Sequence, residues 1–383
     1  MLQKEARSGE GETDPVVPYP FSEGNQSWPR HQWYIAAWSR EVGSVPLMRK
    51  ILDQEIVFFR TASGRATAVS GLCPHRQMPL ATAQIVDDQL ICPYHGAAFD
   101  AEGRCARLPF QEHIPGAMNL RSFAVEEKGP FIWVWDGDAS TADIGLLPDV
   151  SSLGLMNENY SLFGCGLRHV RARSQIVLEN LFDHSHITFT HAASLGTRTQ
   201  AEGPPKSFDI TDRAGYLAFR HSSPCRPVTE AMRLLFPAIG SFMRVDYRVE
   251  LFGVALVNTV GTESVSCDEQ GESQATAGRM NFFHGITPET ATTTHYFLGG
   301  TRDFGQDNDD YTSVLAERNE RVVDEDIKLL ESIEPYLERT DARSEPNFTT
   351  DATAIRVRRR IERLMQEGAG AGHVTAETAP EAF

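Results

Sequence analysis

The fold of the N-terminal part is decided by residues 71–96, GLCPHRQMPLATAQIVDDQLICPYHG. Two short turns in this stretch each contain a proline, one cysteine and one histidine. The first turn carries Cys73 and His75, and the second carries Cys92 and His95. The chain around them consists of short β-rich runs separated by turn residues, which predicts a small antiparallel sheet or barrel. We therefore expect both turns to lie on a β scaffold.

Two thiolates and two imidazoles suit two kinds of metal centre. A tetrahedral zinc site accepts these ligands. Zinc fingers and ribbons, however, usually pair Cys with Cys and His with His, whereas each turn here mixes one of each. The mixed arrangement suits an asymmetric [2Fe-2S] cluster, in which two cysteines hold one iron and two histidines the other. A structural zinc site remains the alternative, and it predicts a colourless protein instead of a red-brown one.

The pattern Cys-x-His, sixteen residues, then Cys-x-x-His resembles the Rieske motif. The resemblance implies that Cys73, His75, Cys92 and His95 hold a [2Fe-2S] cluster whose potential lies at roughly −150 to +300 mV. The remaining cysteines are expected to be separate packed or partly exposed thiols; they are Cys105, Cys165, Cys225 and Cys267. Neither turn has the additional cysteine that braces the loops of respiratory Rieske proteins.

A second cluster of histidines occurs in residues 179–191, ENLFDHSHITFTH, where a helix is expected. His184 and His191 would share a helix face but lie about 10 Å apart, too far for one metal ion. His186 and His191 are offset by about 140° on a regular helix. They can converge only if the helix bends, widens or ends between them. Asp183 precedes His186 by one turn and can hold its other ring nitrogen. The alternative is a polar, histidine-rich helix face.

An acidic residue in a later helix completes this cluster. Asp326 lies in the middle of an apolar stripe with helical spacing, formed by Leu315, Val322, Leu330, Ile333 and Leu337. Burying an ionised carboxylate costs several kcal/mol unless it is paired or bound to a metal. Two histidines and one carboxylate form the facial triad of non-haem iron oxygenases, which predicts His186, His191 and Asp326 as ligands. The alternative partner is an arginine from residues 356–360. The neighbouring acids are expected to stay in solvent: Asp324 and Glu325.

The whole arrangement is similar to the α subunits of Rieske non-haem iron oxygenases. The matching residues are Asn180, Asp183, His186 and His191, followed downstream by Glu325 and Asp326. The nearest branch contains vanillate O-demethylase, dicamba monooxygenase and toluenesulfonate methyl-monooxygenase. The resemblance implies an α+β chain with an all-β Rieske domain and a helix-grip, START-like catalytic domain. It also implies that His284 contacts substrate, the alternative being a structural hydrogen bond made by a strand residue.

The resemblance further implies a terminal oxygenase component. Electrons from NADH would arrive through a partner reductase, with or without a ferredoxin, and O2 would be used to hydroxylate or O-demethylate a small aromatic substrate, with an aromatic acid favoured. The family assembles as a head-to-tail homotrimer, in which Asp183 would bridge His95 of one protomer to His186 of the next. The alternatives are cis-dihydroxylation of an aromatic ring by the same metals, or a non-catalytic electron carrier with a vacant triad.

Composition agrees with a globular protein of two or three domains. The 383 residues carry a formal net charge of −16, which argues against an extended nucleic-acid-binding surface. No apolar stretch is long enough to span a membrane. The first residues lack the apolar core of a secretory signal, so the cytoplasm is the expected location.

The expected organisation follows from composition and periodicity. The proposed parts are a flexible arm (1–28), a Rieske domain (29–138), a catalytic domain (150–367) and a flexible tail (368–383). Between and within these parts we expect a linker at 138–148, a helix within 171–193, strands within 207–302 interrupted by a polar hairpin loop at 263–278, and helices at 311–337 and 351–365.

Overall fold

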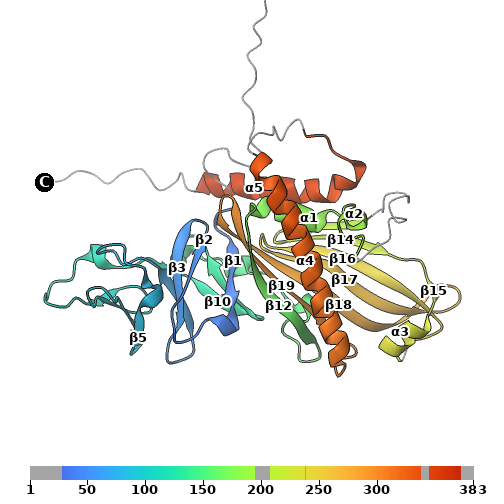
Figure 1. Cartoon of the computed structure of the whole chain (residues 1–383), viewed down its shortest axis with the longest axis horizontal. Helices are drawn as coiled ribbons and strands as arrows, with labels where there is room; N and C mark the ends of the chain where they lie inside the picture. Colours follow the sequence, from blue (N-terminus) through green and yellow to red (C-terminus); the bar gives the residue numbers. More distant parts are fainter. Residues whose placement is uncertain (1–27, 195–207, 238, 338–344, 372–383) are drawn as a thin grey trace, which may run out of the picture.

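The computed structural model describes residues 28–194, 208–237, 239–337 and 345–371. The molecule is elongated (Figure 1): small N-terminal sheets lie at one end, and one large sheet with its helices occupies the other. Within the described residues, no helix has the length and apolar character required to cross a membrane.

The N-terminal part is built from three small antiparallel sheets. Their strand orders are β1-β11-β10, β2-β3-β4-β9 and β5-β6-β7-β8. The strands are β1 (Trp33–Trp38), β2 (Leu47–Ile51), β3 (Gln54–Arg60), β4 (Ala66–Ser70), β5 (Gln84–Val86), β6 (Gln89–Ile91), β7 (Ala98–Phe99), β8 (Cys105–Arg107), β9 (Ser122–Phe123), β10 (Val125–Lys128) and β11 (Phe131–Trp135). The all-β character predicted for this part is confirmed, and the two Cys-His turns connect its strands.

Strands β1 and β11 join the two halves of the molecule. Every residue of both strands is buried, because one face packs within the N-terminal part and the other against the large sheet. The Trp38 ring stacks on Phe131 at 4.9 Å between centroids and meets Phe297 edge-on at 5.9 Å. Aromatic contacts of this kind stabilise an interface beyond the area that they bury.

The C-terminal part is organised around one eight-stranded antiparallel sheet with the order β12-β19-β18-β17-β16-β14-β13, and β15 pairs with β16. The strands are β12 (Ser161–Val170), β13 (Asp209–Arg213), β14 (Tyr216–Ser222), β15 (Arg226–Pro227), β16 (Phe242–Phe252), β17 (Leu256–Cys267), β18 (Ser273–Thr290) and β19 (Thr293–Arg302). Side chains alternate between the two faces of a strand. In β18, Phe283 therefore faces the N-terminal part while His284 faces the helices.

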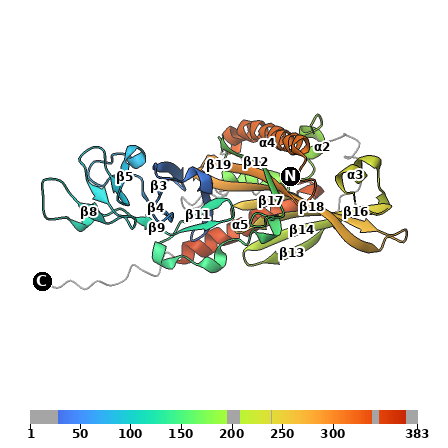
Figure 2. The same cartoon turned by 90° about the horizontal axis from the view of Figure 1, so that it is seen from below.

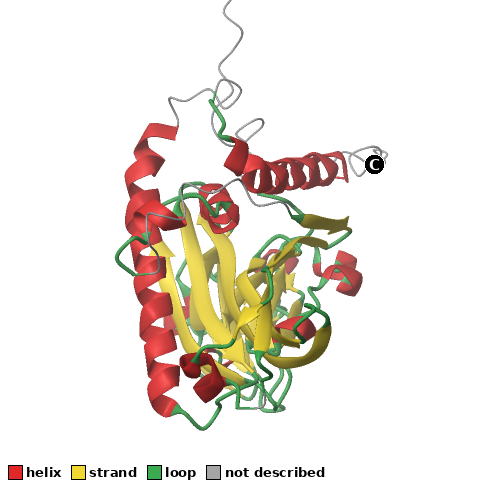
Figure 3. Cartoon of the chain, turned by 90° about the vertical axis from the view of Figure 1, so that its right-hand side faces the viewer, coloured by secondary structure: helices red, strands yellow, loops and turns green. Residues whose placement is uncertain are grey.

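Helices cover the second face of the large sheet. They are α1 (Ser174–Phe182), α2 (Ile187–Thr190), α3 (Glu230–Leu235), α4 (Asp309–Leu337) and α5 (Ala352–Ala371). The long helix α4 runs along the sheet and packs on β12 and β19, whereas α5 crosses one end and packs on α1 (Figures 2 and 3). This α+β arrangement, with its large antiparallel sheet, matches the expected fold.

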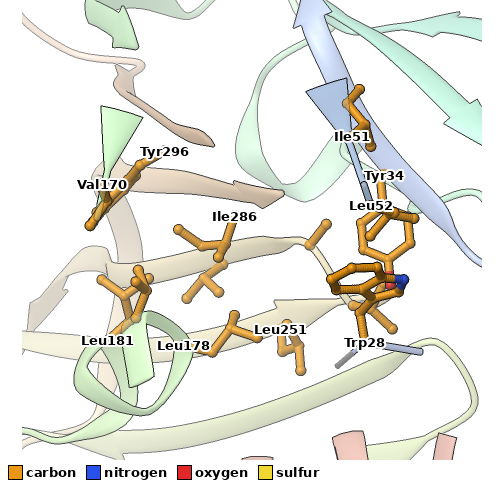
Figure 4. Close-up of a cluster of buried hydrophobic side chains, with 14 of the residues drawn as sticks. Trp28, Tyr34, Ile51, Leu52, Val170, Leu178, Leu181, Leu251, Ile286 and Tyr296 are labelled. Atoms are coloured by element: carbon orange, nitrogen blue, oxygen red, sulfur yellow. The ribbon is translucent and has the colours of Figure 1, made fainter. Parts of the chain in front are cut away.

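An apolar core lies between this sheet face and the helices (Figure 4). Leu178 and Leu181 of α1 point at Ile286 of β18, with Val170 and Tyr296 beside them. Burial of each such side chain contributes about 1.5–3 kcal/mol. The core therefore fixes the position of the end of α1, where the histidine cluster begins.

Several sequence expectations about strands and loops are wrong. The predicted hairpin loop at 263–278 is mostly strand, because β17 continues to Cys267 and β18 starts at Ser273, leaving only a short turn. Its polar residues occupy both buried and exposed positions of these strands, so composition misled the prediction. Strands β16 and β17 are joined by a turn between Phe252 and Leu256. Strand β12 and helix α3 were not predicted.

The ends and the linker also differ from expectation. Trp28 is buried in the core although the sequence places it in the arm, while residues 1–27 lie outside the described residues. Helix α5 continues to Ala371, four residues into the predicted tail, of which 372–383 lie outside the described residues. The predicted linker contains short 3-10 turns whose leucines pack on the β1–β11 core.

Two cysteines expected to be separate thiols are joined in a disulfide, Cys225 with Cys267. They are 42 residues apart in the chain. Strand pairing brings them together, since Cys267 ends β17 opposite the start of β16 and β15 lies on the other side of β16. Cys105 and Cys165 remain free, as expected.

Candidate active site

The two Cys-His turns have the same backbone construction. In the first, the Cys73 amide donates to the Met78 carbonyl at 2.9 Å. In the second, the Cys92 amide donates to the Ala97 carbonyl at 2.8 Å, and Gly96 donates back to Cys92 at 3.0 Å. Gly96 adopts φ +71°, a left-handed conformation that favours glycine. Each turn thus projects its cysteine and histidine from a tight loop.

The donor atoms of these turns separate into an inner and an outer pair. Cys73 and Cys92 are each 2% exposed, whereas His75 and His95 are exposed at the surface. The two histidine Nδ1 atoms approach to 3.2 Å. Burial raises the pKa of the Cys73 thiol to about 11, so a protonated thiol is favoured unless a metal binds. Inner sulfurs and outer imidazoles fit a two-iron cluster better than a single ion.

The second histidine cluster forms where a helix stops. Helix α1 ends at Phe182, and Asp183 adopts an extended conformation with φ −88° and ψ 114°. The Asp183 carboxylate accepts hydrogen bonds from the backbone amide and the hydroxyl of Ser185, both at 2.7 Å. The four-residue helix α2 then begins after His186 and ends before His191. The sequence predicts that His186 and His191 converge only if the helix bends, widens or ends between them. The interruption between α1 and α2 and the short length of α2 provide this change of direction.

His186, His191 and Asp326 come together at this break. One donor atom from each lies within 4.8 Å of the others. Asp326 Oδ1 is 3.1 Å from His191 Nε2 and 3.5 Å from His186 Nε2. His191 is 1% exposed and Asp326 5%. A buried carboxylate facing two imidazole nitrogens is the donor set of a facial triad, so the residues fit a mononuclear iron.

The Nδ1 atoms of His186 and His191 each face a further carboxylate. Glu325 lies 2.7 Å from His191 Nδ1 and also accepts from Ser194. The expectation that Glu325 stays solvated is therefore wrong. Asp183 lies 3.5 Å from His186 Nδ1. With the Nδ1 side of each ring facing a carboxylate, both Nε2 atoms are free to face the metal position.

The structure disagrees with two statements made from the sequence about this region: the alternative arginine partner of Asp326 and the position of the apolar stripe on α4. Three of the four arginines in residues 356–360 have other partners, since Arg356 and Arg360 pair with Asp212 and Arg358 pairs with Glu179, while Arg359 is exposed. The predicted stripe on α4 is also displaced, because Ile333 is 38% exposed while Val323 and Asn319 are buried. His184 lies outside the triad, with its ring 5.6 Å from that of Phe208.

Comparison with known proteins decides the family. Residues 32–124 match the family described as Rieske [2Fe-2S] domain, and residues 170–367 match the vanillate O-demethylase oxygenase C-terminal domain. The chain is 30% identical to the oxygenase component of dicamba O-demethylase from Stenotrophomonas maltophilia, over 88% of this chain and 98% of the relative. It belongs to the Rieske non-haem iron oxygenases.

Other relatives agree with this assignment. The vanillate O-demethylase oxygenase subunit of a Pseudomonas strain is 29% identical over 90% of this oxygenase and 98% of its own length. The crystal structure of dicamba monooxygenase bound to dicamba superposes with a TM-score of 0.75 at 29% identity, covering 89% of this chain and 98% of that one. The first is similar to this oxygenase in sequence, and the second is similar in sequence and in fold.

Family membership settles several alternatives. The oxygenase carries a Rieske [2Fe-2S] cluster, not a structural zinc ion, and it uses a mononuclear non-haem iron. It is an oxidoreductase and not merely an electron carrier. As an oxygenase component, it works within a multicomponent system that delivers its electrons.

The triad of the oxygenase opens onto a cavity of about 370 Å³. Apolar side chains from the sheet and from α4 form most of its wall, including Met280, Phe282, Val314, Leu315 and Val322. A chamber whose wall area is mostly apolar but which holds several polar groups is typical of a small-molecule site. Polar residues reach it from α1, β17, β18, β19 and α4.

His284 lies in this cavity wall and is held on both sides. Its Nε2 is 2.9 Å from the Thr259 hydroxyl, and its Nδ1 is 3.0 Å from the Tyr296 hydroxyl. Burial lowers the pKa of His284 to about 3, which keeps the ring neutral. Both ring nitrogens of His284 therefore make hydrogen bonds within the protein, as the structural alternative expects. A contact between His284 and the substrate remains a prediction.

Sequence reasoning missed four residues of the site. Glu325 was assigned to solvent, and Tyr296, Arg318 and Asn319 were not considered. Asn319 precedes Asp326 by seven residues, so helical periodicity could have placed it on the same face. Tyr296 reaches His284 only through the pairing of β18 with β19, which no local pattern reveals.

Proposed function

We propose that this oxygenase component hydroxylates or O-demethylates a small aromatic acid. The observation that carries the proposal is the opening of the His186, His191 and Asp326 triad onto an apolar cavity. Relatives with oxygenase names support the reaction type: dicamba O-demethylase, vanillate O-demethylase and toluene-4-sulfonate monooxygenase. The substrates in these names belong to those proteins, and they suggest a charged aromatic compound here.

For a methoxylated substrate, the proposed reaction is balanced as a monooxygenation. One oxygen atom enters a methyl C–H bond and the other leaves as water, with two electrons and two protons supplied. The resulting hemiacetal collapses to a phenol and formaldehyde. When bound, the mononuclear iron supplies the O2 chemistry and the Rieske cluster supplies electrons.

The protein's own residues would hold and orient these reactants. The hydrogen bond to Glu325 would keep the proton of His191 on Nδ1, leaving its Nε2 lone pair for the metal. Asn180 lies 3.5 Å from Asp326 and would restrict that carboxylate. Phe282 and Val322 would exclude water from the reacting methyl group, which limits side reactions.

We also propose a cytoplasmic homotrimer that receives electrons originating from NADH through a reductase, with or without a ferredoxin. The turns that carry His75 and His95 adjoin β5, and β5 and α2 lie far apart in Figures 1 and 2, which supports transfer between subunits instead of within one. Exposure of both histidines suits docking against a neighbour. Residues 29–138 and 150–367 remain our proposed domain boundaries.

The proposal is tested with a panel of methoxylated, methylated and unsubstituted aromatic acids and a surrogate reductase. Product mass and formaldehyde release would identify O-demethylation, hydroxylation of a methyl group, or cis-dihydroxylation of the ring. We expect formaldehyde from a methoxylated acid and three irons per chain. If a cis-diol were the only product, the proposed monooxygenation would be wrong and the reaction would be ring dihydroxylation. The variant Asp326→Ala should keep the cluster spectrum but lose turnover and mononuclear iron.

A further inference from the structure

The polar residues of the cavity wall fall into two groups. The polar side chains on the sheet are hydrogen-bonded to one another, because His284 contacts both Thr259 and Tyr296. A substrate could use these groups only by breaking bonds that already exist. The second group lies on α4 and is not paired in this way.

Asn319 is the first member of this second group. It is 6% exposed and lines the cavity, yet neither atom of its amide has a hydrogen-bond partner among the described residues. Its Nδ2 atom is fully buried. Buried polar groups in proteins are almost always hydrogen-bonded. An amide left unpaired at a cavity wall therefore indicates that something else supplies the partner.

Arg318 adjoins Asn319 at the cavity rim. Within the part of the chain that the structure describes, its guanidinium group has no carboxylate partner. Arg168 and Arg173, which pack beside α4, are paired with Asp324 and Glu334. Arg321 and Lys328 of α4 also have no ion pair among the described residues, but neither lines the cavity, so Arg318 is the unpaired cation of α4 that a bound molecule can reach.

Spacing along α4 relates this pair to the triad. Asn319 and Asp326 are seven residues apart, which places them on one helix face and about 10 Å apart along the axis. The cavity wall between them includes Val322 and Val323 from the same helix. Apolar side chains of α4 therefore separate the Arg318–Asn319 pair from the triad.

The two ends differ in what they offer an anionic group. At the triad end, the charge of bound iron would offset the carboxylates of Asp183 and Asp326, whereas at the other end the positive charge of Arg318 has no carboxylate partner among the described residues. An anionic group would therefore be attracted to the Arg318 end. Arginine is also the side chain best suited to bind a carboxylate through two parallel hydrogen bonds.

We propose that Arg318 and Asn319 form an anion-recognition subsite that binds the carboxylate of the aromatic substrate. The ring then lies against the apolar side chains of α4, and the group to be oxidised is directed to the triad. This inference rests on the proposed function and adds the residues that select an anionic substrate. A sulfonate has related chemistry and forms a separate arm of the test.

The test measures equilibrium binding to the anaerobic holoenzyme, so that turnover does not interfere. The probes are the 2-, 3- and 4-methoxybenzoates, the matching neutral methoxybenzamides and 4-methoxybenzenesulfonate. The variants are Arg318→Met, Arg318→Lys and Asn319→Leu. Lys328→Met is the matched control, since it removes one exposed cation from the same helix at a position outside the cavity wall.

We expect the native protein to bind one benzoate at least tenfold more tightly than its benzamide. Arg318→Met should raise the Kd of that benzoate about tenfold and leave the benzamide unchanged, since a charge-assisted hydrogen bond contributes about this factor. Arg318→Lys should restore part of the preference. Asn319→Leu should also weaken benzoate binding, whereas Lys328→Met should not. Visible spectra and iron content would verify that the variants are folded and loaded.

The outcomes separate this inference from the proposed function. Equal binding of benzoate and benzamide, with formaldehyde still produced, would overturn the subsite alone. Equal weakening of both probes in Arg318→Met would show a structural role and would also overturn it. Failure of every probe to bind would overturn the proposed function and the subsite together. A sulfonate that binds more tightly than every benzoate would replace the carboxylate as the recognised group.

Discussion

Glu325 accepts a hydrogen bond from His191 at 2.7 Å, although the residue before it, Asp324, turns away to pair with Arg168. The two adjacent acids of α4 therefore differ in role, since Glu325 orients His191 and Asp324 forms an ion pair with Arg168. Although burial works against the charged form, Asp326 and Glu325 raise the pKa of His191. The same two carboxylates that surround this ring also favour cation binding beside it.

Replacing Glu325 should weaken the mononuclear iron site. In Glu325→Gln, we expect the affinity for this iron to fall about 10–100-fold, because the ring of His191 is no longer oriented by a charged acceptor. Iron per chain after dialysis against a chelator would measure the loss, and the cluster spectrum should not change. Asp324→Asn is the control. Equal iron retention by both variants would contradict the orienting role of Glu325.

Asp183→Asn should affect electron delivery more than metal binding. Although burial raises its pKa, the contacts with His186 and Ser185 lower the pKa of Asp183 to about 2, so the native side chain is charged at neutral pH. Asparagine keeps an acceptor for Ser185 but removes the charge. We expect both metal centres to remain loaded while cluster reoxidation with substrate slows about tenfold or more in a stopped-flow single turnover. Unchanged kinetics, with Ser185→Ala as reference, would refute the proposed bridge.

His284 should make stability depend on pH below neutrality. Its folded pKa of about 3 lies below the value of about 6.5 expected for the unfolded chain, so the unfolded state binds the proton first. Stability contributed by the neutral ring is present above about pH 6.5 and is lost as the pH falls toward 3. At pH 5 the loss is about 2 kcal/mol.

This pH dependence is measured by comparison with His284→Gln, which keeps polar atoms but does not titrate. Urea unfolding at pH 7.5 and pH 5.0 gives the free energy of unfolding for both proteins. The native protein should lose about 2 kcal/mol more than the variant over this interval. Equal losses would mean that His284 is protonated in the folded state or is solvated.

Glu334 should be important for stability because it joins α4 to the start of α1. Its carboxylate accepts from the backbone amide of Arg173 at 2.9 Å and from its guanidinium at 2.6 Å, and both side chains are nearly buried. Glu334→Ala would remove the carboxylate that pairs with the nearly buried Arg173 guanidinium, at a cost of about 3 kcal/mol. Denaturant unfolding measures the change.

The matched control for this prediction is one turn away. Glu331 makes a similar pair with Arg171, but the Arg171 side chain is 76% exposed. Exposed pairs contribute less than about 1 kcal/mol. Glu331→Ala should therefore have a small effect. A similar loss in both variants would show that burial does not distinguish the two pairs.

Local sequence was sufficient where the chemistry is encoded within one loop. Cys73 and His75 are separated by one residue, and Cys92 and His95 by two, so the turns present both donors whatever surrounds them. The histidines of the second cluster were also found from their density. Asp326 was found because a charged residue interrupts an apolar helix face.

The predictions that were wrong concern contacts between segments that are distant in the sequence. Glu325 was assigned to solvent because helical periodicity locates the apolar face but not the element that packs beside it. The Cys225–Cys267 disulfide and the Tyr296–His284 contact both join residues on different strands. The polar strands on either side of the turn after Cys267 were mistaken for a loop, since composition alone does not distinguish polar strand residues from loop residues.

The order of residues alone determined which atoms are available for metals: the two Cys-His turns, two histidines five apart and one acid in an apolar stripe. Their types and spacings are covalent facts that folding does not change. Only the tertiary structure decided that α1 stops at Phe182, that α4 brings Asp326 to His191, and that Asn319 faces a cavity without a partner. These are relations between distant segments, set by packing of the whole sheet against its helices.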